Sequence, residues 1–242
     1  MSTYSLSICN KVIRIESECG KFIRFCKGYI IQEPAPEPDY TITVSRSEIN
    51  LQRYISLGYS YGIDMSEGFV VLRKLSEQLL RDEKILFMHG SVVAYKNSAY
   101  MFTADSGVGK TTHSRLWTLN LNDAYILNGD KPFISVGEKV VAWGSPWCGV
   151  ERYNRNEGLQ LKSICFLQRA EKNSITEISF DDALPLLARQ TGDPGIIQND
   201  YRISILENLY NLGKKVKLYK FEMNNFAEDA FATSYQVLSK LD

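Results

Sequence analysis

One segment of the sequence carries residue types suited to binding a nucleoside triphosphate. The run Ala104-Asp105-Ser106-Gly107-Val108-Gly109-Lys110-Thr111 contains two glycines that let backbone N–H groups turn toward a phosphate. Lys110 can then reach the β and γ phosphates, and Thr111 can offer its hydroxyl to Mg²⁺. Ala104 stands where the strictest form of the motif has glycine. The run predicts ATP and Mg²⁺ as cofactors, with nucleotide contacts from Asp105, Ser106, Gly107, Val108, Gly109, Lys110, Thr111 and Thr112.

The surrounding sequence supports this interpretation. Residues 98–103 are typical of a buried strand that runs into the loop, and residues 111–119 are typical of a helix that leaves it. The helix N-terminus would then lie at the phosphates, where its free N–H groups and dipole favour an anion.

Asp130 is the first candidate for the chemistry itself. It follows a predicted strand at residues 124–129 and lies twenty residues beyond Lys110, so the intervening helix could return its carboxylate to the triphosphate. There it would hold Mg²⁺ together with Thr111, or accept the proton of an attacking hydroxyl. An ordinary turn aspartate in Gly-Asp-Lys-Pro is the alternative.

The two histidines lead to different expectations. His89 is a catalytic candidate, because a hairpin of residues 91–94 and 99–102 with its turn at 96–97 would place it beside the nucleotide loop. A structural role is the alternative for this side chain. His113 lies three residues beyond Lys110 on the predicted helix, and we expect it to pack or to lie at the surface.

Residues 143–152 combine two tryptophans with several turn formers and predict a shaped loop beside the strand ends. We expect it to line the pocket of a phosphate acceptor, although its tryptophans would suit a core equally well. Cys148 is not expected to be a nucleophile, because no histidine is near it in sequence. Arg169 is a further phosphate clamp candidate, and residues 189–195 predict either a mobile cover or an ordinary loop. The acceptor-binding candidates are Ser145, Cys148, Gly149, Glu151, Arg152 and Arg155.

Composition excludes several classes of partner. The 242 residues contain 28 lysines and arginines and 28 acids, so no broad field attracts nucleic acid or an anionic membrane. Five cysteines without a C-x-x-C pair predict reduced thiols and a cytoplasmic setting. No signal pattern is present, and no apolar run approaches the roughly 18 residues of a membrane span.

The predicted elements indicate two parts: a small β-rich lobe with a bridging helix at residues 1–80, and an α/β nucleotide-binding domain at residues 81–242. The prolines of residues 34–38 predict a loop, or a segment that another chain binds. A hairpin turn at Gly137-Glu138 predicts a mixed sheet. The predicted strands are 4–8, 12–16, 22–25, 40–44, 85–88, 125–127, 133–136, 140–143, 161–168 and 216–221, and the remaining helices are 69–81, 181–190, 199–212 and 226–241.

His89-Gly90-Ser91-Val92-Val93, the loop at residues 104–111 and Asp130 together resemble the C-terminal catalytic domain of the HPr kinase/phosphorylase family. The Gly-Lys-Thr-Thr ending of the loop is similar to that of ATP-dependent phosphoenolpyruvate carboxykinase, a relative of that family. The resemblance implies a P-loop fold and self-association. It also implies phosphate binding by Lys110, metal binding by Thr111 and a catalytic acid at Asp130.

Two departures from the family bear on the acceptor. HPr kinases carry two adjacent aspartates where this chain has Gly129-Asp130. The sequence of residues 145–149 instead resembles that of kinase-like proteins found beside peptide-modification genes. We therefore expect an ATP-dependent kinase acting on a hydroxyl of a small molecule or peptide rather than on HPr. The alternatives are a nucleotide-dependent switch that binds a partner without modifying it and, more weakly, a carboxykinase-like activity.

Overall fold

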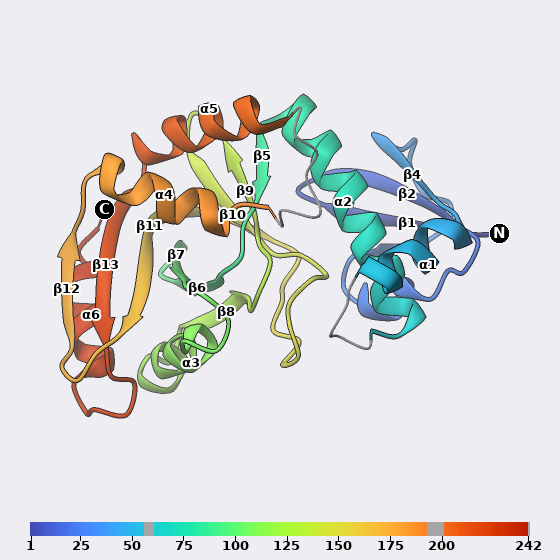
Figure 1. The fold of residues 1–242 in the computed structure, drawn as a ribbon. Coiled ribbons are helices and arrows are strands. Elements are labelled where there is room, and N and C mark those ends of the chain that lie inside the picture. The colour runs from blue at the N-terminus through green and yellow to red at the C-terminus, as the bar shows by residue number, and fades with distance from the viewer. Residues whose placement is uncertain (56–60, 193–200, 242) are drawn as a thin grey trace. The chain divides into compact units, whose positions relative to one another are not determined.

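The computed structural model describes residues 1–55, 61–192 and 201–241 (Figure 1). The chain divides into two compact units, Met1–Leu79 and Leu80–Asp242. In the part of the chain so described, no helix is long and apolar enough to cross a membrane. The five cysteines are all free thiols.

The first unit is built on a four-stranded sheet in the order β3-β1-β2-β4. β1 and β2 form an antiparallel hairpin, and β4 lies parallel to β2. The proline-containing residues 34–38 form a loop between β3 and β4. The elements are β1 (Ser2–Ile8), β2 (Lys11–Ser17), a 3-10 helix (Phe22–Phe25), β3 (Ile30–Ile31), β4 (Tyr40–Val44), α1 (Arg46–Ile55) and α2 (Ile63–Glu83), which continues into the second unit.

The strand predicted at residues 22–25 is wrong, because a buried carboxylate organises this segment. Glu67 on α2 accepts hydrogen bonds from the backbone N–H groups of Gly20, Lys21 and Phe22 at 2.9, 2.7 and 2.9 Å. The ring of Phe22 packs directly against Gly68, where a Cβ atom would lie 2.6 Å from it. Glu67 thus fixes the chain up to Phe22 against α2, and residues 22–25 continue from there as a 3-10 helix rather than as a strand.

The second unit contains a nine-stranded mixed sheet. Its strands follow the order β5-β9-β10-β11-β7-β6-β8, and β13 pairs with β11 and β12. β7, β11 and β13 are mutually parallel, whereas the other pairs are antiparallel, so the predicted mixed sheet is confirmed. The strands are β5 (Ile85–Phe87), β6 (Ser91–Tyr95), β7 (Ser98–Thr103), β8 (Tyr125–Asn128), β9 (Phe133–Val136), β10 (Val140–Trp143), β11 (Gly158–Arg169), β12 (Ser174–Glu177) and β13 (Lys217–Met223).

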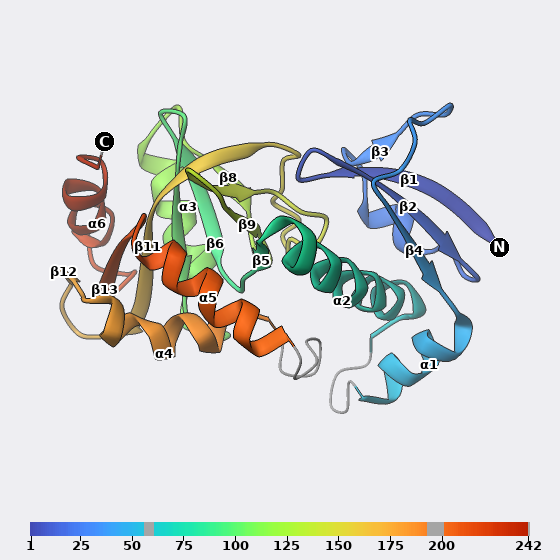
Figure 2. The same ribbon diagram turned by 90° about the horizontal axis from the view of Figure 1, so that it is seen from above.

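Helices cover both faces of this sheet (Figures 1 and 2). α4 (Phe180–Gln190) and α5 (Arg202–Gly213) pack on one face, and α3 (Lys110–Asn120) and α6 (Ala230–Leu238) pack on the other. Strand β7 shows why two cores form: Ala99 and Met101 belong to the α4–α5 side, whereas Tyr100 and Phe102 belong to the α3–α6 side. Successive side chains of a strand point to opposite faces, so an apolar strand needs cover on both.

In this unit one strand was not predicted, one predicted helix begins outside the described residues, and one predicted helix is longer than the structure shows. Strand β12 was not predicted, and its side chains are mostly exposed. The predicted helix at residues 199–212 begins in residues outside the described ones, and its described part is α5. The predicted C-terminal helix is shorter, because residues 224–229 form a hydrogen-bonded loop before α6.

His113 packs in the core between α3 and α6, as expected. One ring nitrogen lies 2.9 Å from Asn225 Oδ1 and the other 3.0 Å from Ser234 Oγ, and the ring meets Phe102 and Phe221 edge-on. Burial lowers the pKa of His113 to about 4. The folded protein therefore holds this imidazole neutral, whereas the unfolded chain protonates it near its ordinary pKa of about 6.5.

Acid should therefore destabilise the second unit through His113. Because the folded-state pKa is depressed, the stabilisation is present above about pH 6.5 and is lost as pH falls toward 4, by about 3 kcal/mol. Urea unfolding followed by tryptophan fluorescence reports this unit alone, since the three tryptophans are Trp117, Trp143 and Trp147. His113→Gln should remove most of the pH dependence; an unchanged dependence in that variant would assign it to other groups.

Candidate functional site

The predicted nucleotide loop connects β7 to α3 at one edge of the sheet. Gly107 and Gly109 have φ angles of 79° and 126°, a region that disfavours side chains. α3 begins at Lys110 without a side-chain cap and without an acidic residue in its first turn. Its first N–H groups have no partner within the helix, so the loop and helix present backbone donors suited to an anion.

The two glycines provide a matched pair for mutation. A Cβ atom on Gly107 would meet nothing within 4 Å, whereas one on Gly109 would lie 2.7 Å from Asn225 Nδ2 and 3.1 Å from Met223 Cε. Gly109→Ala should therefore cost more stability than Gly107→Ala, by about 1–3 kcal/mol, because it adds a steric clash and because a φ of 126° is harder for an alanine than one of 79°. Chemical denaturation measures the difference. Equal effects would show that the contact between Gly109 and Asn225 does not constrain the loop.

Lys110 points back over this loop. Its ammonium donates hydrogen bonds to the backbone oxygens of Ala104 and Asp105 at 3.0 and 3.2 Å. The side chain is buried, and burial lowers its pKa, although nearby Asp130 and Asp105 oppose that shift. The charge of Lys110 is thus poorly solvated, and an additional anion beside it would stabilise the charged form.

Backbone hydrogen bonds hold Asp130 at the same edge of the sheet. Asn128, the last residue of β8, accepts from the N–H groups of Asp130 and Lys131 at 3.0 and 2.8 Å through its side-chain oxygen. The N–H of Gly90 donates to the backbone oxygen of Asp130 at 2.8 Å, which ties this turn to the start of β6. The turn is therefore fixed by two neighbouring strands.

The carboxylate of Asp130 lies between the side chains of His89 and Lys131. His89 Nε2 is 3.1 Å from one carboxylate oxygen, and Lys131 Nζ is 2.7 Å from the other. Burial raises the pKa of Asp130, but the His89 hydrogen bond and the Lys131 charge outweigh it and hold the pKa at about 2. Asp130 is consequently ionised at neutral pH. Both Asp130 and Lys131 act on the pKa of Lys110, which places all three charges in one electrostatic cluster.

A chain of hydrogen bonds connects His89 to the loop at residues 104–111. His89 Nδ1 lies 3.2 Å from Gln190 Oε1 at the end of α4, and Gln190 Nε2 donates to Asp105 at 3.4 Å. Arg189 forms an exposed ion pair with the same Asp105 at 2.8 Å. The structure thus brings together His89, Asp130 and the loop, as the sequence predicted. The predicted cover at residues 189–195 ends outside the described residues, and its described part anchors Asp105.

The loop at residues 143–152 approaches Asp130 through its backbone. A Cβ atom on Gly149 would lie 3.2 Å from Asp130 Cβ, and one on Gly129 would lie 2.7 Å from the backbone oxygen of Cys148. The thiol of Cys148 is buried, and burial together with Asp130 raises its pKa to about 11. It is therefore protonated at neutral pH. Glu151 and Arg152 are exposed in the turn that follows Gly149.

Two acceptor-binding predictions for this segment are corrected. Ser145 is completely buried: its hydroxyl donates to the backbone oxygen of Lys131 at 2.6 Å and accepts from Asn128 at 3.1 Å, so it shapes the turn rather than lining a pocket. Arg155 stacks 3.7 Å over the ring of Tyr125 at the start of β8, whereas Asp130 follows the opposite end of that strand. Its guanidinium is not brought to Asp130.

Sequence reasoning missed two side chains of the site. Lys131 follows Asp130 directly, and its position beside a candidate carboxylate was a usable signal. Asn225 donates to the backbone oxygen of Gly109 at 3.2 Å but lies 116 residues away, so no local pattern indicates it. Arg169, predicted as a clamp, lies at the end of β11 and donates to the backbone oxygens of Gly107 and Val108.

The donors at this edge fit Mg²⁺. Magnesium prefers oxygen ligands and is held by one or two protein groups together with substrate phosphates and water. Asp130 supplies an ionised carboxylate, and Thr111 supplies a hydroxyl in the first turn of α3. Among the described residues, no group of three or more His, Cys, Asp or Glu side chains forms a metal site from protein ligands alone.

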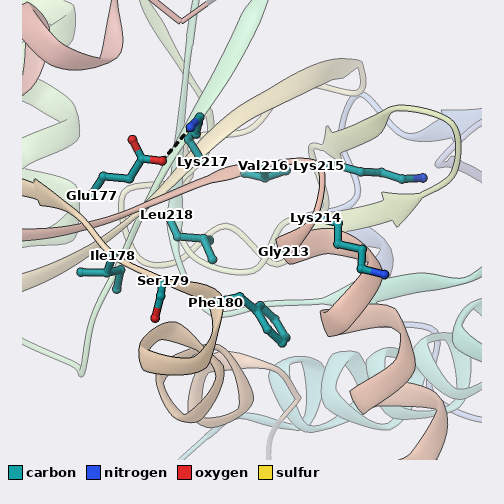
Figure 3. Close-up of a pocket in the computed structure, with 10 residues that line it drawn as sticks. All are labelled: Glu177, Ile178, Ser179, Phe180, Gly213, Lys214, Lys215, Val216, Lys217 and Leu218. Carbon is teal, nitrogen blue, oxygen red and sulfur yellow. Dashed lines mark hydrogen bonds and ion pairs between the residues drawn. The ribbon is translucent and has the colours of Figure 1, made fainter.

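A separate pocket of about 360 Å³ lies at the opposite edge of the sheet (Figure 3). It is formed where β12 leads into α4 and α5 leads into β13, and it includes Lys214, Lys215 and Lys217. Lys217 pairs with Glu177 at 2.6 Å, and Lys215 donates to the backbone oxygen of Gly137. β13 is parallel to β7 and begins at this pocket, whereas the candidate site lies where β7 ends. The pocket and the candidate site are therefore distinct.

Comparison with models of protein families finds no match, and comparison with curated proteins finds none either. Among solved structures, the chain is similar to the structure of the HPr(Ser) kinase/phosphatase from Coxiella burnetii. That likeness has a TM-score of 0.36 and 9% identity, and it covers 62% of this chain and 90% of that chain.

Proposed function

We propose that this chain is an ATP- and Mg²⁺-dependent kinase that transfers the γ-phosphoryl group to a hydroxyl of a small molecule or peptide. One observation carries the proposal: an ionised aspartate, held by His89 and Lys131, shares an electrostatic cluster with Lys110 of a glycine-containing strand–loop–helix segment. Phosphoryl transfer requires these parts, because it depends on positioning and on neutralising charge around the phosphates.

The loop would bind the triphosphate. Backbone N–H groups from Gly107 to Thr111 and the ammonium of Lys110 would surround the phosphates, and Lys110 would exchange its bonds to loop carbonyls for bonds to phosphate oxygens. Thr111 and Asp130 would hold Mg²⁺, which neutralises phosphate charge when bound.

Asp130 would orient the acceptor hydroxyl. A carboxylate whose conjugate acid has a pKa of about 2 is a weak base, so Asp130 would first position the acceptor hydroxyl. It would take the hydroxyl proton late, when the bond to phosphorus is already forming in a loose transition state. His89 and Lys131 would fix the carboxylate's direction. The acceptor would enter beside Gly149, with Glu151 and Arg152 in the adjoining turn, and Arg152 would favour an anionic acceptor.

The experiment is transfer of label from γ-³²P-ATP with Mg²⁺ to a panel of hydroxylated metabolites and peptides. We expect at least one labelled product, absent with Lys110→Ala. Tight ATP binding without a labelled product across a broad panel would instead favour the nucleotide-dependent switch.

A further inference from the structure

An exposed phenylalanine stands beside the nucleotide loop. Phe226 lies between β13 and α6, and its side chain is 96% exposed. Large apolar side chains in such a position leave apolar surface in water unless a ligand or partner covers them.

The segment that carries Phe226 is held in place by hydrogen bonds. Asn224 N–H donates to Asn173 Oδ1 at 2.7 Å, and Asn224 Oδ1 accepts from Phe226 N–H at 3.1 Å. Asn173 also donates to Asp229 at 2.7 Å, and the N–H of Ala227 donates to the backbone oxygen of Asn224 at 3.0 Å. The segment is therefore anchored at several points, and this anchored backbone presents the phenyl ring to solvent.

The residue before Phe226 contacts the loop directly. Asn225 Nδ2 donates to the backbone oxygen of Gly109 at 3.2 Å, and Asn225 Oδ1 lies 2.9 Å from His113 Nδ1 on α3. Consecutive Cα atoms are about 3.8 Å apart, so Phe226 begins one residue from a side chain that touches the loop. Figure 1 shows the segment between β13 and α6 next to α3.

The order of the strands places Phe226 and Asp130 on opposite sides of the loop. The sheet runs β8-β6-β7-β11, with β13 beyond β11, and β7 carries the loop. Asp130 follows β8, and His89 precedes β6. Arg169 ends β11, and Phe226 follows β13 at the same edge. A nucleoside triphosphate carries its γ-phosphate and its base at opposite ends, so a γ-phosphate directed toward Asp130 would direct the nucleoside toward β11 and β13.

We propose that the ring of Phe226 stacks on the base of the bound nucleotide. This inference rests on the proposed function and adds the position of the nucleoside. Stacking on an aromatic ring accepts any base, because every base has a π face, so Phe226 supplies affinity for the nucleoside rather than a choice between adenine and guanine. Arg169, on the same side of the loop, lies between the phosphates and the base.

Calorimetry with two ligands isolates the contribution of the nucleoside. ATP and inorganic tripolyphosphate, each with Mg²⁺, share the phosphate chain, but only ATP carries a ribose and a base. Phe226→Ala should weaken ATP binding by about tenfold to a hundredfold and leave tripolyphosphate binding unchanged. Phe226→Tyr should restore ATP binding. Leu119→Ala is the matched control, because Leu119 is also exposed, at 74%, but lies at the other end of α3.

Fluorescence gives a second test. With Phe226→Trp, ATP should quench the added fluorescence and tripolyphosphate should not. Unchanged ATP affinity in Phe226→Ala, or an equal loss for both ligands, would overturn the stacking role while leaving the proposed function standing. A wild-type chain that binds neither ligand would overturn both.

Discussion

Replacing Lys110 with alanine is expected to abolish ATP binding, with a loss of at least about a hundredfold in affinity. The ammonium already donates hydrogen bonds to two carbonyl oxygens of the loop, at 3.0 and 3.2 Å. Hydrogen bonds from a charged donor are worth about 1.5–3 kcal/mol each, and this lysine would make at least two of them to phosphate. Competition between labelled and unlabelled ATP on a filter-binding assay measures the loss.

Lys110→Ala should not unfold the protein, which makes its binding loss interpretable. Burial lowers the pKa of Lys110, so the folded protein gains little from its charge, and the variant should stay folded with a thermal midpoint lowered only by the loss of two hydrogen bonds to loop carbonyls. Lys110→Met preserves the length of the side chain without the charge and serves as a control. Retained affinity in either variant would mean that the phosphates bind elsewhere.

Asp130→Asn should slow phosphoryl transfer by about a hundredfold to ten-thousandfold, which is the usual contribution of a positioned acid or base. The amide keeps the shape of the carboxylate but loses its charge and its capacity to take the acceptor's proton. ATP binding should be weakened far less than transfer, because the loop and Lys110 are unaltered and only the Mg²⁺ contact of Asp130 is lost. Single-turnover transfer of ³²P to an identified acceptor measures the rate, and Asp123→Asn, a change in an exposed carboxylate between α3 and β8, provides a comparison. Unchanged turnover in Asp130→Asn would remove its assigned role.

Local sequence signals predicted the frame that positions the site. Lys96 and Asn97 have φ angles of 48° and 59°, the left-handed pair that a tight hairpin requires, and the hairpin of β6 and β7 follows from them. That hairpin brings His89 to the end of β7, where the loop begins. The sequence could therefore predict that His89 lies near the loop. The second hairpin, at Gly137, follows from the same kind of turn signal.

Contacts between distant residues were not predictable from local patterns. The segment at residues 22–25 resembles a strand, but Glu67, 45 residues from Phe22, binds the N–H groups at its start, those of Gly20, Lys21 and Phe22. Ser145 resembles a pocket residue in a turn-rich segment, but Asn128 and Lys131 enclose its hydroxyl. In both cases a buried polar group, the carboxylate of Glu67 or the hydroxyl of Ser145, determines the local backbone conformation. A buried polar group needs hydrogen-bond partners, and these partners are distant in the sequence.

A crystal structure with Mg²⁺ and a non-hydrolysable ATP analogue tests the central claim most directly. It should show the phosphates on the N–H groups from Gly107 to Thr111, with Lys110 on the β and γ phosphates and the γ-phosphate facing Asp130. An analogue bound elsewhere, such as in the pocket beside Lys214 and Lys217, with the loop still closed on Lys110, would contradict it.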